Sequence, residues 1–189
     1  TKDACLKLCN QDRNELIALM KKYGVMSKAL DDRSGCWALI MAMKQAEKSE
    51  NDIYAVFTAQ EEVGLRGAKT AAAHINPDIA VSVDVSNVGD TPQSEELNLS
   101  LGKGPAIKLK DASFIIHENV KDMLLDCAKE ANIPYQMEAA SYGGTDAGAI
   151  HLSGGGVRAG TISIPTRYIH SLADSAPELY QFLIFAHRP

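Results

Sequence analysis

Short apolar runs alternate with helical patterns along most of this chain. Apolar runs bounded by polar or turn residues predict strands at 53–57, 79–83, 107–109, 136–139 and 159–164. Apolar residues at helical spacing predict helices at 12–23, 35–47, 64–73, 119–131, 145–152 and 177–186. Because the strands read as apolar throughout, we expect an α/β fold with a mostly parallel central sheet covered by helices on both faces.

Composition narrows the class of protein. The chain has 189 residues, 46% apolar and 23% charged, which fits a single domain over residues 1–189. A net charge of −5 without a lysine- or arginine-rich patch argues against nucleic acid as a partner. No apolar run approaches the ~20 residues of a membrane span, and no signal peptide pattern is seen. We therefore expect a cytoplasmic protein that binds neither membrane nor nucleic acid.

The four cysteines are also consistent with a cytoplasmic protein. Cys5, Cys9, Cys36 and Cys127 match no zinc-ribbon or redox spacing. Cys5 and Cys9 would share a helix face, but two thiols alone make a poor metal site. Reduced thiols are the simpler interpretation, because cytosolic proteins rarely keep disulfides.

Two adjacent carboxylates, Glu61 and Glu62, follow the first predicted strand. Neighbouring side chains at a strand end point in different directions, so one glutamate can hold a metal ion while the other moves a proton. That division of labour is what a metal-dependent hydrolase requires. A Glu-Glu pair alone is weak evidence, since most such pairs are solvated surface.

Other candidate ligands also follow predicted strands or begin helices. Carboxylate oxygens together with an imidazole suit Zn²⁺, Co²⁺ or Mn²⁺. Each candidate has a structural alternative: an aspartate or glutamate caps a helix or makes a turn, and a lone histidine is usually structural. Taken together, they favour a metal site more than a set of independent structural roles. The candidates are Asp31, Glu61, Glu62, Asp84 and His170.

A set of motifs, in matching order, resembles one family. The chain is similar to the tetrahedral-type (TET) or glutamyl aminopeptidases, some of which are named endoglucanases, and the similarity runs from Lys28 to Ser171. The resemblance implies a zinc-peptidase-like catalytic domain that acts on peptides. Glycosidase chemistry ranks low, because adjacent glutamates would not face a sugar from two sides. The motifs are KALDDRSG (28–35), FTAQEEVG (57–64), VD (83–84), GGTDA (143–147) and IPTRYIHS (164–171).

The resemblance also implies roles for single residues. Asp31 resembles a ligand that bridges two metal ions, and its bond to Asp32 resembles a cis peptide. Glu62 and His170 resemble ligands of one ion, and Asp84 a ligand of the other. Glu61 resembles the general base. Asp146 matches no ligand, and it would orient a ligand or the substrate amine.

The chain departs from the family in two places. Family members take a further ligand from an early His-x-Asp motif, and no histidine here is followed two residues later by Asp. They also insert a PDZ-like dimerisation domain before the 28–35 motif, and it is absent near 25–28. We therefore expect one well-occupied Zn or Co site, one weak site, and self-association that is not dodecameric. The alternative is a catalytically impaired metal-binding or assembly homologue, or a fragment, of that family.

Overall fold

The computed structural model describes residues 24–46, 49–92, 94, 97–171 and 174–176. The helices predicted at 12–23 and 177–186 lie outside these residues. None of the described helices is long and apolar enough to cross a membrane. The elements in chain order are β1 (Val25–Ser27), α3 (Leu30–Gln45), α4 (Arg66–Ile75), β2 (Ile79–Asn87), β3 (Ala106–Lys110), α5 (Glu118–Glu130), β4 (Gln136–Ala139), α6 (Ala147–Ile150), β5 (Arg158–Thr166) and β6 (Asp174–Ala176).

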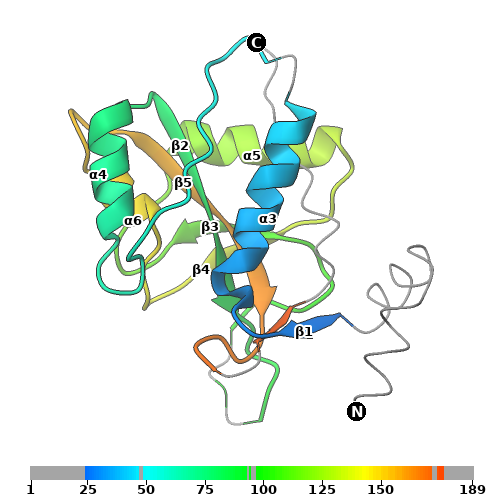
Figure 1. Cartoon of the computed structure of the whole chain (residues 1–189). Helices are drawn as coiled ribbons and strands as arrows, with labels where there is room; N and C mark the ends of the chain where they lie inside the picture. Colours follow the sequence, from blue (N-terminus) through cyan, green and yellow to red (C-terminus); the bar gives the residue numbers. More distant parts are fainter. Residues whose placement is uncertain (1–23, 47–48, 93, 95–96, 172–173, 177–189) are drawn as a thin grey trace.

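The central sheet has four strands in the order β2-β5-β3-β4. β2 runs parallel to β5 in an unbroken register from Ile79↔Arg158 to Asn87↔Thr166. β3 is parallel to β4 and antiparallel to β5, so the sheet is mixed but mostly parallel, as predicted. A small antiparallel sheet, β1 with β6, lies near the start of α3 (Figure 1).

The two faces of the sheet differ in polarity. β2 alternates valines with Ser82, Asp84 and Ser86, and the parallel register pairs Ser82 with Thr161 and Asp84 with Ser163 of β5. The expectation that the strands are apolar throughout is therefore wrong. The valines of β2 lie on one face of the sheet, and the other face carries the polar residues of a site.

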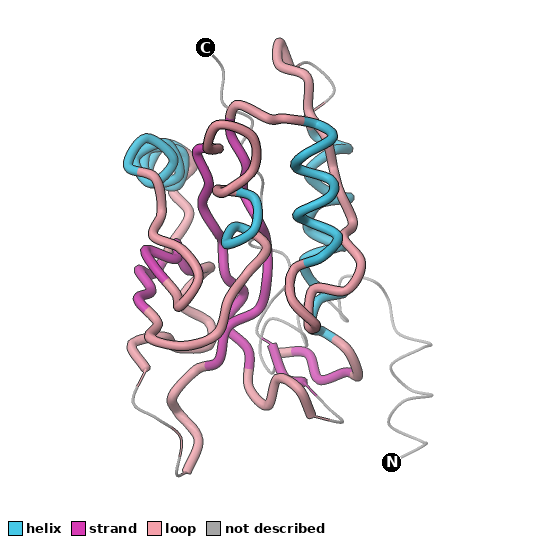
Figure 2. The backbone as a smooth tube through the Cα atoms, turned by 90° about the vertical axis from the view of Figure 1, so that its left-hand side faces the viewer, coloured by secondary structure: helices cyan, strands magenta, loops and turns pink. Residues whose placement is uncertain are grey.

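Helices cover both faces, as predicted. α3 packs on β2, and α5 packs on β5 and β3, through the apolar face. α6 packs on the polar face of β2 and β5, and α4 packs against α6. In Figure 1, α4 and α6 lie to the left of β2 and β5, with α3 on the other side, and Figure 2 shows the helices around the paired strands.

Most predicted elements are confirmed within a few residues. The strand predicted at 136–139 is confirmed at its bounds. β2 and β5 extend beyond the predicted 79–83 and 159–164, and β5 continues through Pro165. The helix predicted at 145–152 is shorter, because only Ala147–Ile150 is helical.

The strand predicted at 53–57 is wrong. The structure assigns no strand there, and Ile53, Tyr54 and Phe57 expose 42%, 65% and 53% of their surface. An apolar run becomes a buried strand only where a neighbouring strand and a covering layer exist. Within the described residues, β2 pairs only with β5, and the run at 53–57 joins no ladder.

The contact between α5 and β5 yields a stability prediction. A Cβ placed on Gly160 would lie 2.7 Å from Val120 Cγ1 and 3.1 Å from Ile116 Cδ1. Gly160→Ala should therefore lower the free energy of unfolding by about 1–3 kcal/mol through overpacking. Chemical denaturation measures the change. The matched control is Gly155→Ala, because a Cβ at Gly155 meets nothing within 4 Å. Equal stability of the two variants would contradict this packing.

Candidate metal centre

At the start of α3, the adjacent residues Asp31 and Asp32 have different roles. Asp31 and Asp32 have non-helical backbone angles and are joined by a cis peptide bond, as the family resemblance implies. Asp32 Oδ1 accepts a hydrogen bond from the Gly35 amide at 3.0 Å, so Asp32 serves the helix start as a cap. Gly35 is needed there, because a Cβ would collide with the Asp32 carboxylate. Asp31 is left to point toward the site.

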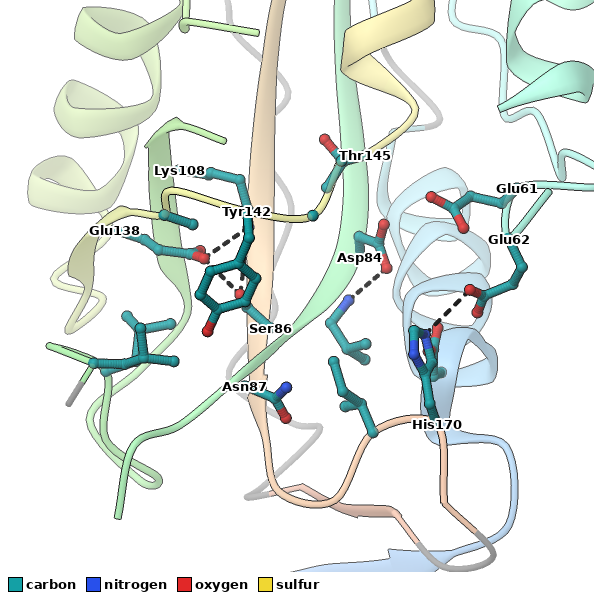
Figure 3. Close-up of a pocket in the computed structure, with 18 of the residues that line it drawn as sticks. Glu61, Glu62, Asp84, Ser86, Asn87, Lys108, Glu138, Tyr142, Thr145 and His170 are labelled. Atoms are coloured by element: carbon teal, nitrogen blue, oxygen red, sulfur yellow. Dashed lines mark hydrogen bonds and ion pairs between the residues drawn. The ribbon is translucent and has the colours of Figure 1, made fainter. Parts of the chain in front are cut away.

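A tight loop carries Glu61 and Glu62. The Gly67 amide donates to Ala59 O at 2.9 Å and the Leu65 amide donates to Glu61 O at 2.9 Å, which closes the loop onto the start of α4. Glu62 Oε2 lies 3.1 Å from His170 Nε2. In Figure 3 the Glu62 carboxylate turns toward His170, whereas Glu61 turns toward the side of Asp84. The two glutamates thus point in different directions, as predicted, although a loop rather than a strand delivers them.

His170 completes a cluster of three potential ligands. It follows β5, and its Nε2 lies 3.3 Å from Asp31 Oδ2. The ligand atoms of Asp31, Glu62 and His170 all lie within 4.8 Å of one another. Bonds of ~2.0–2.1 Å to a tetrahedral ion would set ligand atoms about 3.3 Å apart, so these separations fit a divalent ion. Among the described residues this is the one group of that kind.

Asp84 and Asp146 lie near this cluster but outside it. Asp84 sits on the polar face of β2, and its Oδ1 accepts from the Val85 amide at 2.7 Å. Asp146 Oδ2 accepts from Thr58 Oγ1 at 2.6 Å, which ties the residue before α6 to the loop that carries the glutamates. Asp146 Oδ1 is buried and has no hydrogen-bond partner among the described residues.

Burial and like charges make these carboxyl groups hard to ionise. Burial, with the neighbouring acids, raises the pKa of Asp32 and of Asp84 to about 8. Burial, then the charges of Glu62, Asp146 and Asp31, raises the pKa of Glu61 to about 7. A bound cation would favour the ionised forms, so the crowding of acids is itself suited to a metal ion.

A cavity of about 500 Å³ extends from the cluster across the polar face of the sheet. Its far side holds a buried ion pair, Lys108 Nζ to Glu138 Oε1 at 2.6 Å, with Ser86 bonded to both. Figure 3 shows this pair on the opposite side of Asp84 from His170. The sequence analysis missed the pair, and the only signal was a charged residue at the centre of each of two short strands.

Acids from a helix start, a loop and the interior of β2 meet an imidazole that follows β5, and such a cluster over an α/β sheet is suited to a metal-dependent hydrolase. The chain belongs to the M42 glutamyl aminopeptidase family, whose model matches residues 13–177. M42 peptidases are metal-dependent, which agrees with the cluster. The similarity to aminopeptidases expected from the motifs is thereby confirmed.

Individual relatives agree with this membership. A putative aminopeptidase of Acetivibrio thermocellus is 54% identical over 159 residues, which are 84% of this chain and 48% of that protein. Aminopeptidase APDkam598 of Desulfurococcus kamchatkensis superposes with a TM-score of 0.79 at 45% identity, over 83% of this chain and 46% of that one. A TET aminopeptidase of a marine sediment thaumarchaeon gives 0.77 at 40% identity, over 82% and 45%. The chain spans about half the length of these relatives.

The raised pKa values predict how stability depends on pH. Asp32 has a folded pKa of about 8 against an ordinary 3.8, so the folded state binds more protons than the unfolded state between these values. Without metal, the free energy of unfolding should fall as pH rises from about 5 to about 8. Asp32→Asn keeps an acceptor for the Gly35 amide and should flatten this fall.

Melting temperatures in the presence of a chelator measure this dependence, and each 1 kcal/mol corresponds to about 2–4 °C. The control is Asp122→Asn, because the Asp122 side chain on α5 is 57% exposed. A metal-free protein that becomes more stable toward pH 8 would show that the acids are not crowded as described.

Proposed function

We propose that this chain carries the catalytic centre of a metal-dependent aminopeptidase, which removes N-terminal residues from peptides. The observation that carries the proposal is the convergence of Asp31, Glu62 and His170 beside the half-buried Glu61. Family membership supports the reaction class.

Asp31, Glu62 and His170 would hold the principal ion, and Asp84 would share with Asp31 a second, weaker one. Oxygen ligands with one imidazole favour Zn²⁺ or Co²⁺, with Mn²⁺ as a further candidate. When bound, the ion supplies Lewis acidity that polarises the scissile carbonyl and lowers the pKa of water.

Glu61 is the proposed general base. A base works best when its pKa is near the working pH, and burial with neighbouring acids raises the pKa of Glu61 to about 7. Its carboxylate would take a proton from the attacking water and later pass it to the leaving amine. Its orientation away from His170 leaves it free for this transfer.

The surrounding negative charge suits a substrate with a free amino terminus. Asp84 and Asp146 contribute carboxylates beside the cluster, and a protonated amine would relieve their repulsion. We propose that Asp146 orients the substrate amine or a metal ligand. The cavity has room for the terminal residue of a peptide.

Domain organisation and compartment remain proposals as well. We propose one catalytic-type domain over 1–189, with no dimerisation domain inserted near 25–28. In support, β1 leads through Lys28 and Ala29 directly into α3. The exposed apolar residues at 53–57 support self-association. Cys36 and Cys127 are free, which supports the cytoplasm.

A second candidate function is that of an impaired metal-binding or assembly homologue. Two observations favour it: the sequence has no His-x-Asp motif, and the described residues form one three-ligand cluster rather than two. Loss of one ion would lower the rate by ~10³-fold or more, since each ~1.36 kcal/mol of lost transition-state stabilisation is tenfold. Release of a chromogenic amine from aminoacyl substrates, with Zn²⁺ or Co²⁺ added, separates the candidates.

Substitution of the two glutamates tests their division of roles. Glu61→Gln should leave metal content near normal and lower kcat by ~10²-fold or more, because it removes a base and not a ligand. Glu62→Gln should lose metal as well as activity. Elemental analysis and the amine-release assay measure both effects. Equal loss of metal in the two variants would refute the assignment.

Metal stoichiometry tests the ligand sets. Asp31, Glu62 and His170 form a complete set of three protein ligands, whereas Asp31 with Asp84 does not. The purified chain, dialysed against metal-free buffer after loading, should retain about one ion per chain. Two tightly retained ions would mean that another residue replaces the missing histidine.

A further inference from the structure

The position of His170 depends on the turn that carries it. The His170 side chain is 64% exposed, so packing against its ring contributes little to its placement. Tyr168 and His170 both have left-handed backbone angles, with φ of 61° and 60°. Non-glycine residues hold such angles only where surrounding contacts enforce them.

Backbone and apolar contacts fix parts of this turn. The Val88 amide donates to Thr166 O at 3.1 Å, which prolongs the pairing of β2 with β5 by one step. Ile169 packs against the cluster of Leu30, Val85 and Ile164. Neither contact reaches the stretch between Thr166 and Ile169, where the chain turns into the left-handed conformation.

A bidentate ion pair between Arg167 and Asp90 anchors this stretch. Arg167 Nε donates to Asp90 Oδ1 at 2.8 Å and its terminal nitrogen donates to Asp90 Oδ2 at 2.6 Å. The hydrogen bond from Arg167 lowers the pKa of Asp90, so the pair stays charged in neutral solution. Two parallel bonds fix the orientation of a guanidinium as well as its distance. The pair joins the segment after β2 to the segment after β5.

We propose that the Arg167–Asp90 ion pair is a positioning device that holds the 167–170 turn, and through it places His170 beside Asp31 and Glu62. The proposal rests on the proposed metal site for its functional meaning, but the restraint on the turn belongs to the metal-free chain. Arg167 and Asp90 do not line the cavity. Both side chains are 36% exposed, so their loss should affect the turn far more than global stability.

The first test measures Co²⁺ binding to the full chain, by competition with a chromophoric chelator and by the visible absorption of bound Co²⁺. Arg167→Gln and Asp90→Asn should each weaken affinity by ~10-fold, the size seen when a group that orients a ligand is removed. The double variant should be no weaker than either single variant, because both changes remove the same contact. The Co²⁺ absorption should change shape, while apo melting temperatures stay close to that of the parent.

The matched control is Lys129→Gln, which removes an exposed ion pair to Asp126 on α5. Its Co²⁺ affinity and spectrum should equal those of the parent. Unchanged affinity in Arg167→Gln, or additive losses in the double variant, would overturn the proposal.

The second test needs no metal and separates this proposal from the proposed function. In the apo chain, ¹⁵N heteronuclear NOE values at Tyr168, Ile169 and His170 should drop in Arg167→Gln and not in Lys129→Gln. Unchanged values would overturn the positioning role, whatever the metal data show. Failure of the metal site itself would appear differently, as equal Co²⁺ affinity of the parent and His170→Ala, with the NOE values still deciding the role of Arg167.

Discussion

The parallel pairing of β2 with β5 is the constraint on which the rest of the structure depends. Its unbroken register sets Asn87 beside Thr166, so the segments that leave both strands start from the same edge of the sheet. Because side chains alternate along a strand, the same register gathers Asp84, Ser86 and Ser163 on one face and leaves the valines for α3 and α5 on the other. Within the described residues β2 has no second partner, so the placement of Asp84 depends on this one ladder.

The polar face of the sheet carries two kinds of buried ionisable groups: an ion pair and a set of carboxyl groups with raised pKa values. At its far side Lys108 and Glu138 neutralise one another, with side chains only 5% and 4% exposed. A buried pair of this kind is costly to break, because either partner alone would be an uncompensated charge. Near His170, by contrast, burial and the neighbouring acids raise the pKa values of Asp32, Asp84 and Glu61. The charges on the Lys108–Glu138 side of the cavity are therefore balanced, whereas the acids on the His170 side are suited to binding a cation.

Sequence patterns predicted the elements that depend on the spacing of apolar residues. They missed the features that depend on contacts between segments distant in the chain. Helical spacing placed α5 to within a residue, because Val120, Leu124 and Ala128 form a buried stripe. The run at 53–57 has the composition of a strand, but in the described part it pairs with no strand, and Ile53, Tyr54 and Phe57 stay exposed. The motif pattern named Asp31, Glu62 and His170, and helix capping by one aspartate of the pair is the structural alternative that Asp32 fulfils, whereas only coordinates show that Lys108 meets Glu138. The Lys108–Glu138 pairing joins residues 30 positions apart in the chain, and no local pattern encodes it.

The central claim is that Asp31, Glu62 and His170 together bind a divalent ion beside Glu61. The most direct measurement is a crystal structure of the chain grown with Zn²⁺, with diffraction collected on both sides of the zinc absorption edge. The account predicts an anomalous peak within bonding distance of Asp31, Glu62 and His170, at ~2.0–2.2 Å from their ligand atoms. A peak bound by other residues, or no peak at this cluster in crystals that contain zinc elsewhere, would contradict it.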